Sequence, residues 1–195
     1  TKVSELCIVL PNKRAKIFLL HYLSNEFGKP IWAPAIYSIE DFISQLNGSQ
    51  PIDEVTACFE FYSVYAKIEG EQAQSFDDFL TWAPTLLHDF NELDQYLIDT
   101  TALFNYLSDE RAISLWNLGT KELSDFQKKY LRFWKSLVNY YTQYKQHLAA
   151  RNLQYGGMAY RKAAENCVQL TKNKNWFKLL FAGFNALNTA EKVCI

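Results

Sequence analysis

The sequence predicts a predominantly helical α/β protein. Two short runs have the character of buried strands, at residues 6–10 and 177–181, and the patterns between them are almost all helical. Strand signals alternating with helical patterns are typical of a parallel sheet. We therefore expect the two strands to be neighbours in one α/β subdomain, formed by residues 1–50 and 171–195, with a helical insertion at residues 51–170.

The composition is that of an ordinary folded protein. Apolar residues make up 49% and charged residues 21%, which excludes a disordered charged tail. Because 20 Lys and Arg nearly balance 21 Asp and Glu, any nucleic-acid contact must come from a local cluster of cations. The four isolated cysteines favour free thiols over disulfides or zinc. No apolar run is long enough to span a membrane, so we expect a cytoplasmic protein without a membrane partner.

The first strand and the helix after it form a βα unit. Residues 6–10 are continuously apolar and end at Pro11, as in a buried parallel strand. A helix is expected over residues 12–27, ended by Gly28. Its predicted core face follows helical spacing and consists of Ala15, Phe18, Leu19, Tyr22 and Leu23.

A weaker extended segment is expected at residues 31–37, before a second helix. Ser38 has the properties of an N-cap for a helix over residues 39–46. Its hydroxyl can accept a hydrogen bond from the backbone N–H of Asp41, which is at the N3 position. Near the other end, the strand at residues 177–181 precedes a helix that starts at Asn188 with Glu191 in the capping-box position.

The middle of the chain is expected to be almost entirely helical. The predicted helices cover residues 53–68, 76–88 with an interruption at Pro84, 90–97, 101–106, 111–116, 122–150 and, after Gly156 and Gly157, 158–170. The long helix carries an aromatic stripe that we interpret as a core face rather than a base-stacking platform. The stripe consists of Phe126, Tyr130, Phe133, Trp134, Leu137, Tyr140, Tyr141, Tyr144 and Leu148.

Signatures of catalysis are weak. The phosphate-binding pattern G-x-x-x-x-G-K-[ST] is absent, and we assign no catalytic residue, cofactor or metal. The segment at residues 88–94 is rich in oxygen ligands, but Asp89, Glu92 and Asp99 are also typical of an exposed helix face. We therefore interpret these residues as a solvated face rather than a metal site. The histidines His21, His88 and His147 lack the spacing of metal ligands.

The most specific local feature is the junction between the first strand and its helix. Pro11 and Asn12 end the strand, and Lys13 and Arg14 open the helix. Two cations beside free backbone amides suit a nucleic-acid phosphate. The alternative is a helix start that carries two solvated cations.

Four segments resemble, in order and spacing, the helicase-like N-terminal part of AddB-type subunits, bacterial proteins that combine an inactivated superfamily 1 helicase with a PD-(D/E)XK nuclease domain. Residues 8–15 are similar to the strand followed by Pro-Thr/Asn-x-Arg-Ala in these proteins, and residues 37–42 to the Thr-Ile-x-Ser/Asp-Phe/Leu segment. Residues 82–94 resemble the helical insertion. Residues 179–188, followed by Glu191, resemble a strand, an Asp-Gly-Phe turn and a helix.

The resemblance implies a fragment of a P-loop-helicase-like parallel-sheet domain with a large all-helical insertion. It implies contacts to single-stranded DNA from the residues that match the family's loops, which are Pro11, Asn12, Lys13, Arg14, Tyr37 and Ser38. The chain departs from the family at Ala182, where an acidic residue would help to hold magnesium in an active ATPase. The nuclease residues of the family lie beyond Ile195.

The resemblance also implies a role in DNA repair and recombination. The parent protein would be either an ATP-dependent helicase–nuclease subunit or a nuclease with an inactive helicase domain. Its partners would be DNA, the remaining domains of the parent chain and a helicase–nuclease partner subunit. A start at Thr1 before a strand and a stop at Ile195 within a helical pattern lead us to expect a fragment. The alternative is a helical structural or protein-interaction module with no nucleic-acid role.

Overall fold

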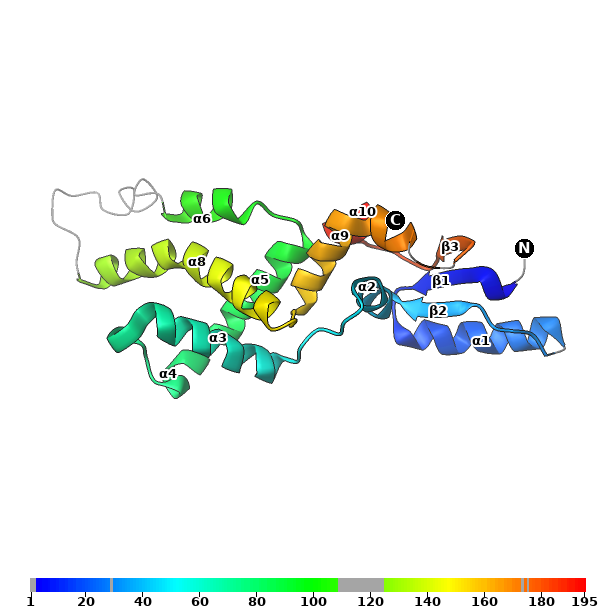
Figure 1. Cartoon of the computed structure of the whole chain (residues 1–195), viewed down its shortest axis with the longest axis horizontal. Helices are drawn as coiled ribbons and strands as arrows, with labels where there is room; N and C mark the ends of the chain where they lie inside the picture. Colours follow the sequence, from blue (N-terminus) through cyan, green and yellow to red (C-terminus); the bar gives the residue numbers. More distant parts are fainter. Residues whose placement is uncertain (1–2, 29, 109–124, 173, 175) are drawn as a thin grey trace. The chain divides into compact units, whose positions relative to one another are not determined.

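The computed structural model is mostly helical and contains a small parallel sheet, as the sequence predicts (Figure 1). The structure describes residues 3–28, 30–108, 125–172, 174 and 176–195, except for the side chains of residues 108, 125–127 and 129–131. The contacts divide the chain into two compact units. The α/β unit comprises Thr1–Pro51 and Ala159–Ile195, and the helical unit comprises Ile52–Met158.

The α/β unit is built on a parallel sheet whose central strand is β1. Its strands are β1 (Leu6–Leu10), β2 (Ala35–Ser38) and β3 (Lys178–Phe181), in the order β2-β1-β3. The predicted neighbourhood of the first and last strands is therefore confirmed. Its helices are the short 3-10 helix η1 (Val3–Glu5), α1 (Lys13–Phe27), α2 (Ile39–Asn47), most of α9 (Gly156–Lys172) and α10 (Thr189–Cys194).

The register of the sheet brings three chain segments together. Val9 of β1 lies opposite Tyr37 of β2 on one side and opposite Phe181 of β3 on the other. Val9 and Cys7 are fully buried. The second strand begins later than the predicted segment at residues 31–37, directly after Pro34, which has no backbone N–H to donate to a ladder.

Both predicted helix caps are confirmed. The Ser38 hydroxyl accepts a hydrogen bond from the Asp41 backbone N–H at 3.2 Å, and α2 begins at the next residue. At α10, the side chain of Asn188 accepts from the Glu191 backbone N–H at 2.8 Å. The Glu191 carboxylate in turn accepts from the Asn188 backbone N–H at 2.9 Å, which completes a capping box.

Helix α9 belongs mainly with the sheet. The division of contacts falls at Ala159, whereas the sequence pattern placed the start of the second α/β segment at residue 171. The reason is that α9 packs within this unit beyond its first turn. Its Ala163 and Ala164 are buried, and the Cys167 thiol lies 3.6 Å from the carbonyl oxygen of Cys194 in α10.

The helical unit contains the remaining helices. They are α3 (Glu54–Glu69), the 3-10 helix η2 (Gly70–Gln72), α4 (Phe76–Leu80), α5 (Ala83–Gln95), α6 (Thr100–Ser108) and α8 (Asp125–Ala150). The helix predicted at residues 111–116 lies outside the described residues. Among the described helices of the chain, none is both long and apolar enough to cross a membrane.

The predicted break at Pro84 is wrong. Pro84 lies in the first turn of α5, where the backbone N–H that proline lacks would have no helical partner in any case. The chain instead leaves the helical conformation between α4 and α5, at Thr81 and Trp82. As a result, α5 runs without interruption through the predicted gap between residues 88 and 90.

Aromatic rings fill the core of the helical unit. Phe61 of α3 is fully buried, and its ring lies 5.2–6.3 Å, centroid to centroid, from the rings of Phe79, Trp82, Phe90, Tyr140 and Tyr144. The aromatic stripe of α8 is a core face, as predicted, over its described part, in which Leu137, Tyr140, Tyr141, Tyr144 and Leu148 are buried and Phe133 and Trp134 pack against the core. The side chains of Phe126 and Tyr130 lie outside the described set.

Candidate nucleic-acid interface

The candidate interface lies at the edge of the sheet where the three parallel strands end. The Ala182 backbone N–H, just after β3, donates to the Val9 carbonyl at 3.0 Å. A Cβ added to Gly183 would lie 3.6 Å from Cδ of Pro11, so the loops after β1 and β3 run against each other. The strand order reverses between β1 and β3. In open parallel sheets, such a reversal is where ligands are usually bound.

Asn12 has a structural role at this edge. Its side-chain oxygen accepts a hydrogen bond from the Ala15 backbone N–H at 2.9 Å, which makes Asn12 the N-cap of α1. The residue is exposed, so the NH₂ group of its side chain faces solvent and can donate to an anion. Pro11, which precedes it, is half-buried.

The two predicted cations differ in their surroundings. The Lys13 ammonium lies 3.3 Å from a carboxylate oxygen of Asp41 in α2, in an ion pair whose lysine side chain is 70% exposed. Arg14 is exposed and, within the described part of the chain, makes no hydrogen bond or ion pair. Lys16 is also exposed, and the first turn of α1 contains no acidic residue. Arg14 is therefore more available to an anionic ligand than Lys13, its neighbour in the predicted set.

The two predicted residues of the second loop are packed into the fold. Ser38 is 1% exposed, and its hydroxyl caps α2. Tyr37 is half-buried, with its ring 6.2 Å from that of Trp176. Ser38 thus fixes the start of α2, and the ring of Tyr37 packs near that of Trp176. Asn12, Lys13 and Arg14 are the members of the predicted set that present exposed polar groups.

The predicted core face of α1 is partly wrong. Ala15, Leu19 and Leu23 are half-buried, but Phe18 and Tyr22 are 56% and 65% exposed. No described residue of α1 is buried. The reason is that the helix is apolar around most of its circumference and packs mainly on β1 and β2, so the sheet covers a narrow strip of it.

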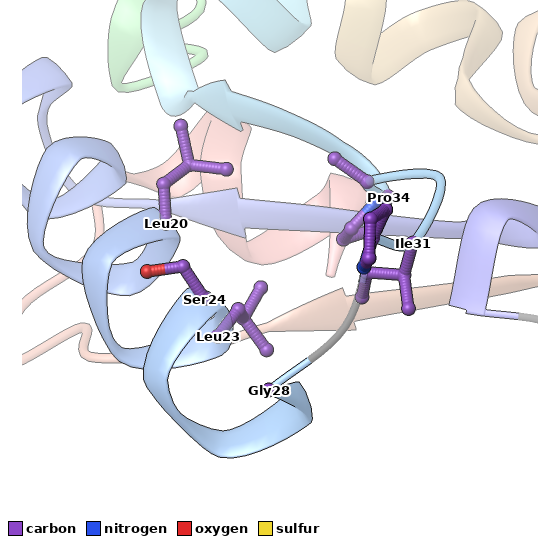
Figure 2. A pocket seen from close by; sticks show the side chains of 8 residues that line it. Leu20, Leu23, Ser24, Gly28, Ile31 and Pro34 are labelled. Carbon is purple, nitrogen blue, oxygen red and sulfur yellow. The ribbon is translucent and has the colours of Figure 1, made fainter.

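A shallow apolar hollow of about 460 Å³ lies beside the second half of α1. Figure 2 shows that it is bounded by Leu20, Leu23 and Ser24 of α1 and by the segment that leads to β2. That segment contributes Ile31 and Pro34. Trp32 of the same segment is 87% exposed. The described residues that line the hollow include no cation, so this lining differs chemically from the edge at Arg14.

Nucleophilic and metal chemistry find little support in the described residues. No group of three or more His, Cys, Asp or Glu side chains among them is arranged to hold a metal ion. Burial raises the pKa of the Cys7 and Cys194 thiols to about 12, so both are protonated at neutral pH and are poor nucleophiles. Gly157, the second residue of α9, allows close packing, because a Cβ there would collide with the backbone of Asn91.

Sequence reasoning missed a buried polar cluster in the helical unit. Asp89, Glu92 and Asp99 are exposed, as predicted for a solvated face, but Asp94 is fully buried. Its carboxylate accepts from the Tyr141 hydroxyl at 2.5 Å and from the Tyr155 hydroxyl, and the Lys145 ammonium lies 3.1 Å away. The available signal was helical spacing, since the buried positions of α5 are Ala83, Leu86, Phe90 and Asp94.

Comparisons with protein-family models, with curated proteins and with solved structures give no match to this chain.

Proposed function

We propose that this chain is the non-catalytic, helicase-like part of a bacterial AddB-type protein and that it binds single-stranded DNA at the edge of its parallel sheet. The observation that carries the proposal is Arg14, an exposed cation without a partner in the described structure, next to the reversal point of the strand order. A phosphate at this edge of the sheet would contact Arg14, the free NH₂ of Asn12 and Lys13 beside them.

The expected mode of binding is contact with the DNA backbone. Arginine, lysine and amide donors recognise phosphate oxygens and do not distinguish bases. Binding should therefore be tolerant of sequence and sensitive to salt, because each neutralised phosphate releases counterions. We place the parent protein in the cytoplasm, with the other domains of the parent chain and a helicase–nuclease subunit as its protein partners.

A guiding role fits this edge better than a motor role. The residue after β3 is Ala182, which is exposed beside the end of the central strand. Alanine has no oxygen with which to hold the magnesium ion of a nucleotide. DNA processing by the parent protein would then use this unit to hold the strand, while hydrolysis takes place on residues beyond those in this chain.

The test is the affinity of the chain for a fluorescent oligo-dT, measured by anisotropy at low and moderate salt. We expect measurable binding that weakens steeply with salt, and a clear loss in Lys13→Ala/Arg14→Ala. The matched control is Lys67→Ala/Lys178→Ala, which removes two exposed lysines, one in the helical unit and one at the opposite end of the sheet. Absence of binding, or equal losses in the two variants, contradicts the proposal.

A protein-interaction role without nucleic acid is the second candidate. The apolar hollow beside α1, together with the exposed Trp32, favours it, because contiguous exposed apolar surface is typical of protein contacts (Figure 2). The same titration separates the two functions. A surface that contacts only protein has no reason to bind oligo-dT at low salt or to respond to the loss of Arg14.

A further inference from the structure

The first two-thirds of α1 carries a line of exposed side chains that continues from the cationic edge. Arg14, Phe18 and Tyr22 are spaced four residues apart, so they lie on one face of the helix, one turn after another. Phe18 and Tyr22 are exposed by 56% and 65%, and Arg14 is exposed as well. We call these three residues the α1 stripe. A helix of a small α/β unit would ordinarily bury such rings.

We propose that the α1 stripe is a stacking surface for the bases of single-stranded nucleic acid, an inference that rests on the function proposed above. Arg14 would hold a phosphate at the start of the stripe, and the rings of Phe18 and Tyr22 would each take the face of a base. Aromatic rings beside cations are the usual means of binding a single strand without sequence preference.

Charge complementarity favours nucleic acid over a protein as the occupant of this face. Lys13, Arg14 and Lys16 are the charged residues at the start of α1, and the first acidic residue along the helix is Glu26, near its end. Of these cations, Arg14 is the one that helical spacing places on the face of the α1 stripe, because Lys13 and Lys16 are five and two residues from Phe18. The stripe thus combines an exposed arginine with flat aromatic surface, a combination that suits a phosphate and the bases next to it.

The spacing of the rings also favours a single strand. Residues four apart in a helix are separated by about 6 Å along its axis. This is nearly twice the roughly 3.4 Å between stacked bases in a duplex. The rings of Phe18 and Tyr22 thus match bases that have been pulled apart, as in an extended strand. Tyr22 is further oriented by the ring of His21, which lies 6.0 Å away in an edge-to-face arrangement.

The experiment compares the affinities of the chain for oligo-dT and for an abasic oligonucleotide of equal length, by anisotropy at low salt. In Phe18→Ala/Tyr22→Ala, binding of oligo-dT should weaken roughly tenfold or more, while binding of the abasic strand should not change. Phe18→Leu/Tyr22→Leu should show most of the same loss, because leucine keeps apolar area but cannot stack. Tyr106→Ala, which removes an aromatic side chain that is 74% exposed in the helical unit, is the matched control.

The outcomes separate this proposal from the one on which it rests. If the unaltered chain does not bind oligo-dT, the proposed function fails, and this inference fails with it. Suppose that the chain binds, and that binding weakens in Lys13→Ala/Arg14→Ala but not in Phe18→Ala/Tyr22→Ala. In that case only the stacking surface is refuted. An equal loss for both oligonucleotides in the aromatic variant also refutes it, because the rings would then act without bases. Circular dichroism of each variant checks that the fold is kept.

Discussion

Two phenylalanines show how differently the units of this chain use aromatic residues. Phe61 in the helical unit is fully buried and lies among five aromatic rings. Phe18 in the α/β unit is 56% exposed on a helix with no buried residue among those described. The rings around Phe61 therefore contribute to the stability of the helical unit. The α/β unit leaves several of its rings exposed, where they can contact a ligand.

The largest expected effect comes from applying one substitution to both residues. Phe61→Ala should lower the free energy of unfolding by about 4 kcal/mol, through lost burial and the cavity left behind. Phe18→Ala should change it by no more than about 0.5 kcal/mol, because an exposed side chain contributes little. Urea unfolding followed by circular dichroism measures both. Similar losses in the two variants would show that Phe18 is a core residue after all.

The buried carboxylate of the helical unit should give the next largest effect. Asp94→Ala removes the acceptor of two tyrosine hydroxyls and the partner of Lys145, so we expect a loss of about 3 kcal/mol in the free energy of unfolding. Asp94→Asn keeps an acceptor oxygen and should lose less. A loss in Asp94→Ala no greater than in the exposed control Asp89→Ala would argue against a structural role for this cluster.

Alkaline pH should weaken the helical unit through its buried tyrosines. Burial raises the pKa of Tyr140, Tyr144 and Tyr155 above the usual value near 10. Because these pKa values are higher in the folded state, the stabilisation is fully present below about pH 10 and is lost as pH rises above it. In that range, each tyrosine should lower the free energy of unfolding by roughly 1.4 kcal/mol for each pH unit.

Urea unfolding at several pH values from 9 to 11 measures this slope. Tyr144→Phe should make it shallower, since phenylalanine has no hydroxyl to ionise in the unfolded chain. A slope that is unchanged in Tyr144→Phe, or a stability that does not depend on pH in this range, would contradict the assigned cause.

The smallest expected effect concerns the charge at the sheet edge. Asp41 pairs with Lys13 at 3.3 Å and places a negative charge beside the proposed phosphate site. Asp41→Asn should strengthen binding of oligo-dT by a few-fold at low salt, because it frees Lys13 and removes a repulsion. Asp77→Asn, at an exposed acid of the helical unit, is the control. Equal effects of both changes would indicate only a general response to net charge.

Local signals explain which parts of the fold were predictable. The strand at residues 6–10 and the caps at Ser38 and Asn188 depend on short stretches of sequence, and the structure has them where predicted. Pro84 was misread because proline permits two outcomes, a break or a first turn, and the surrounding packing chooses between them.

The candidate site was harder to predict, because exposure is set by packing between distant segments. On α1, apolar residues occur around most of the helix, so the pattern could not identify the face that the sheet covers. Lys13 and Arg14 were indicated together, yet only contacts between helices show that Asp41 lies against Lys13. Asp94 was assigned to the solvated face by its charge, although its spacing places it with Leu86 and Phe90.

The central claim is that Arg14 contacts a phosphate of single-stranded DNA. The most direct measurement is the dependence of the oligo-dT binding constant on salt concentration, for the unaltered chain and for Arg14→Ala. On a plot of log binding constant against log salt, loss of one phosphate contact should reduce the slope by about 0.7. A slope that is unchanged in Arg14→Ala, with the fold intact, would show that DNA is held elsewhere or is not a ligand of this edge.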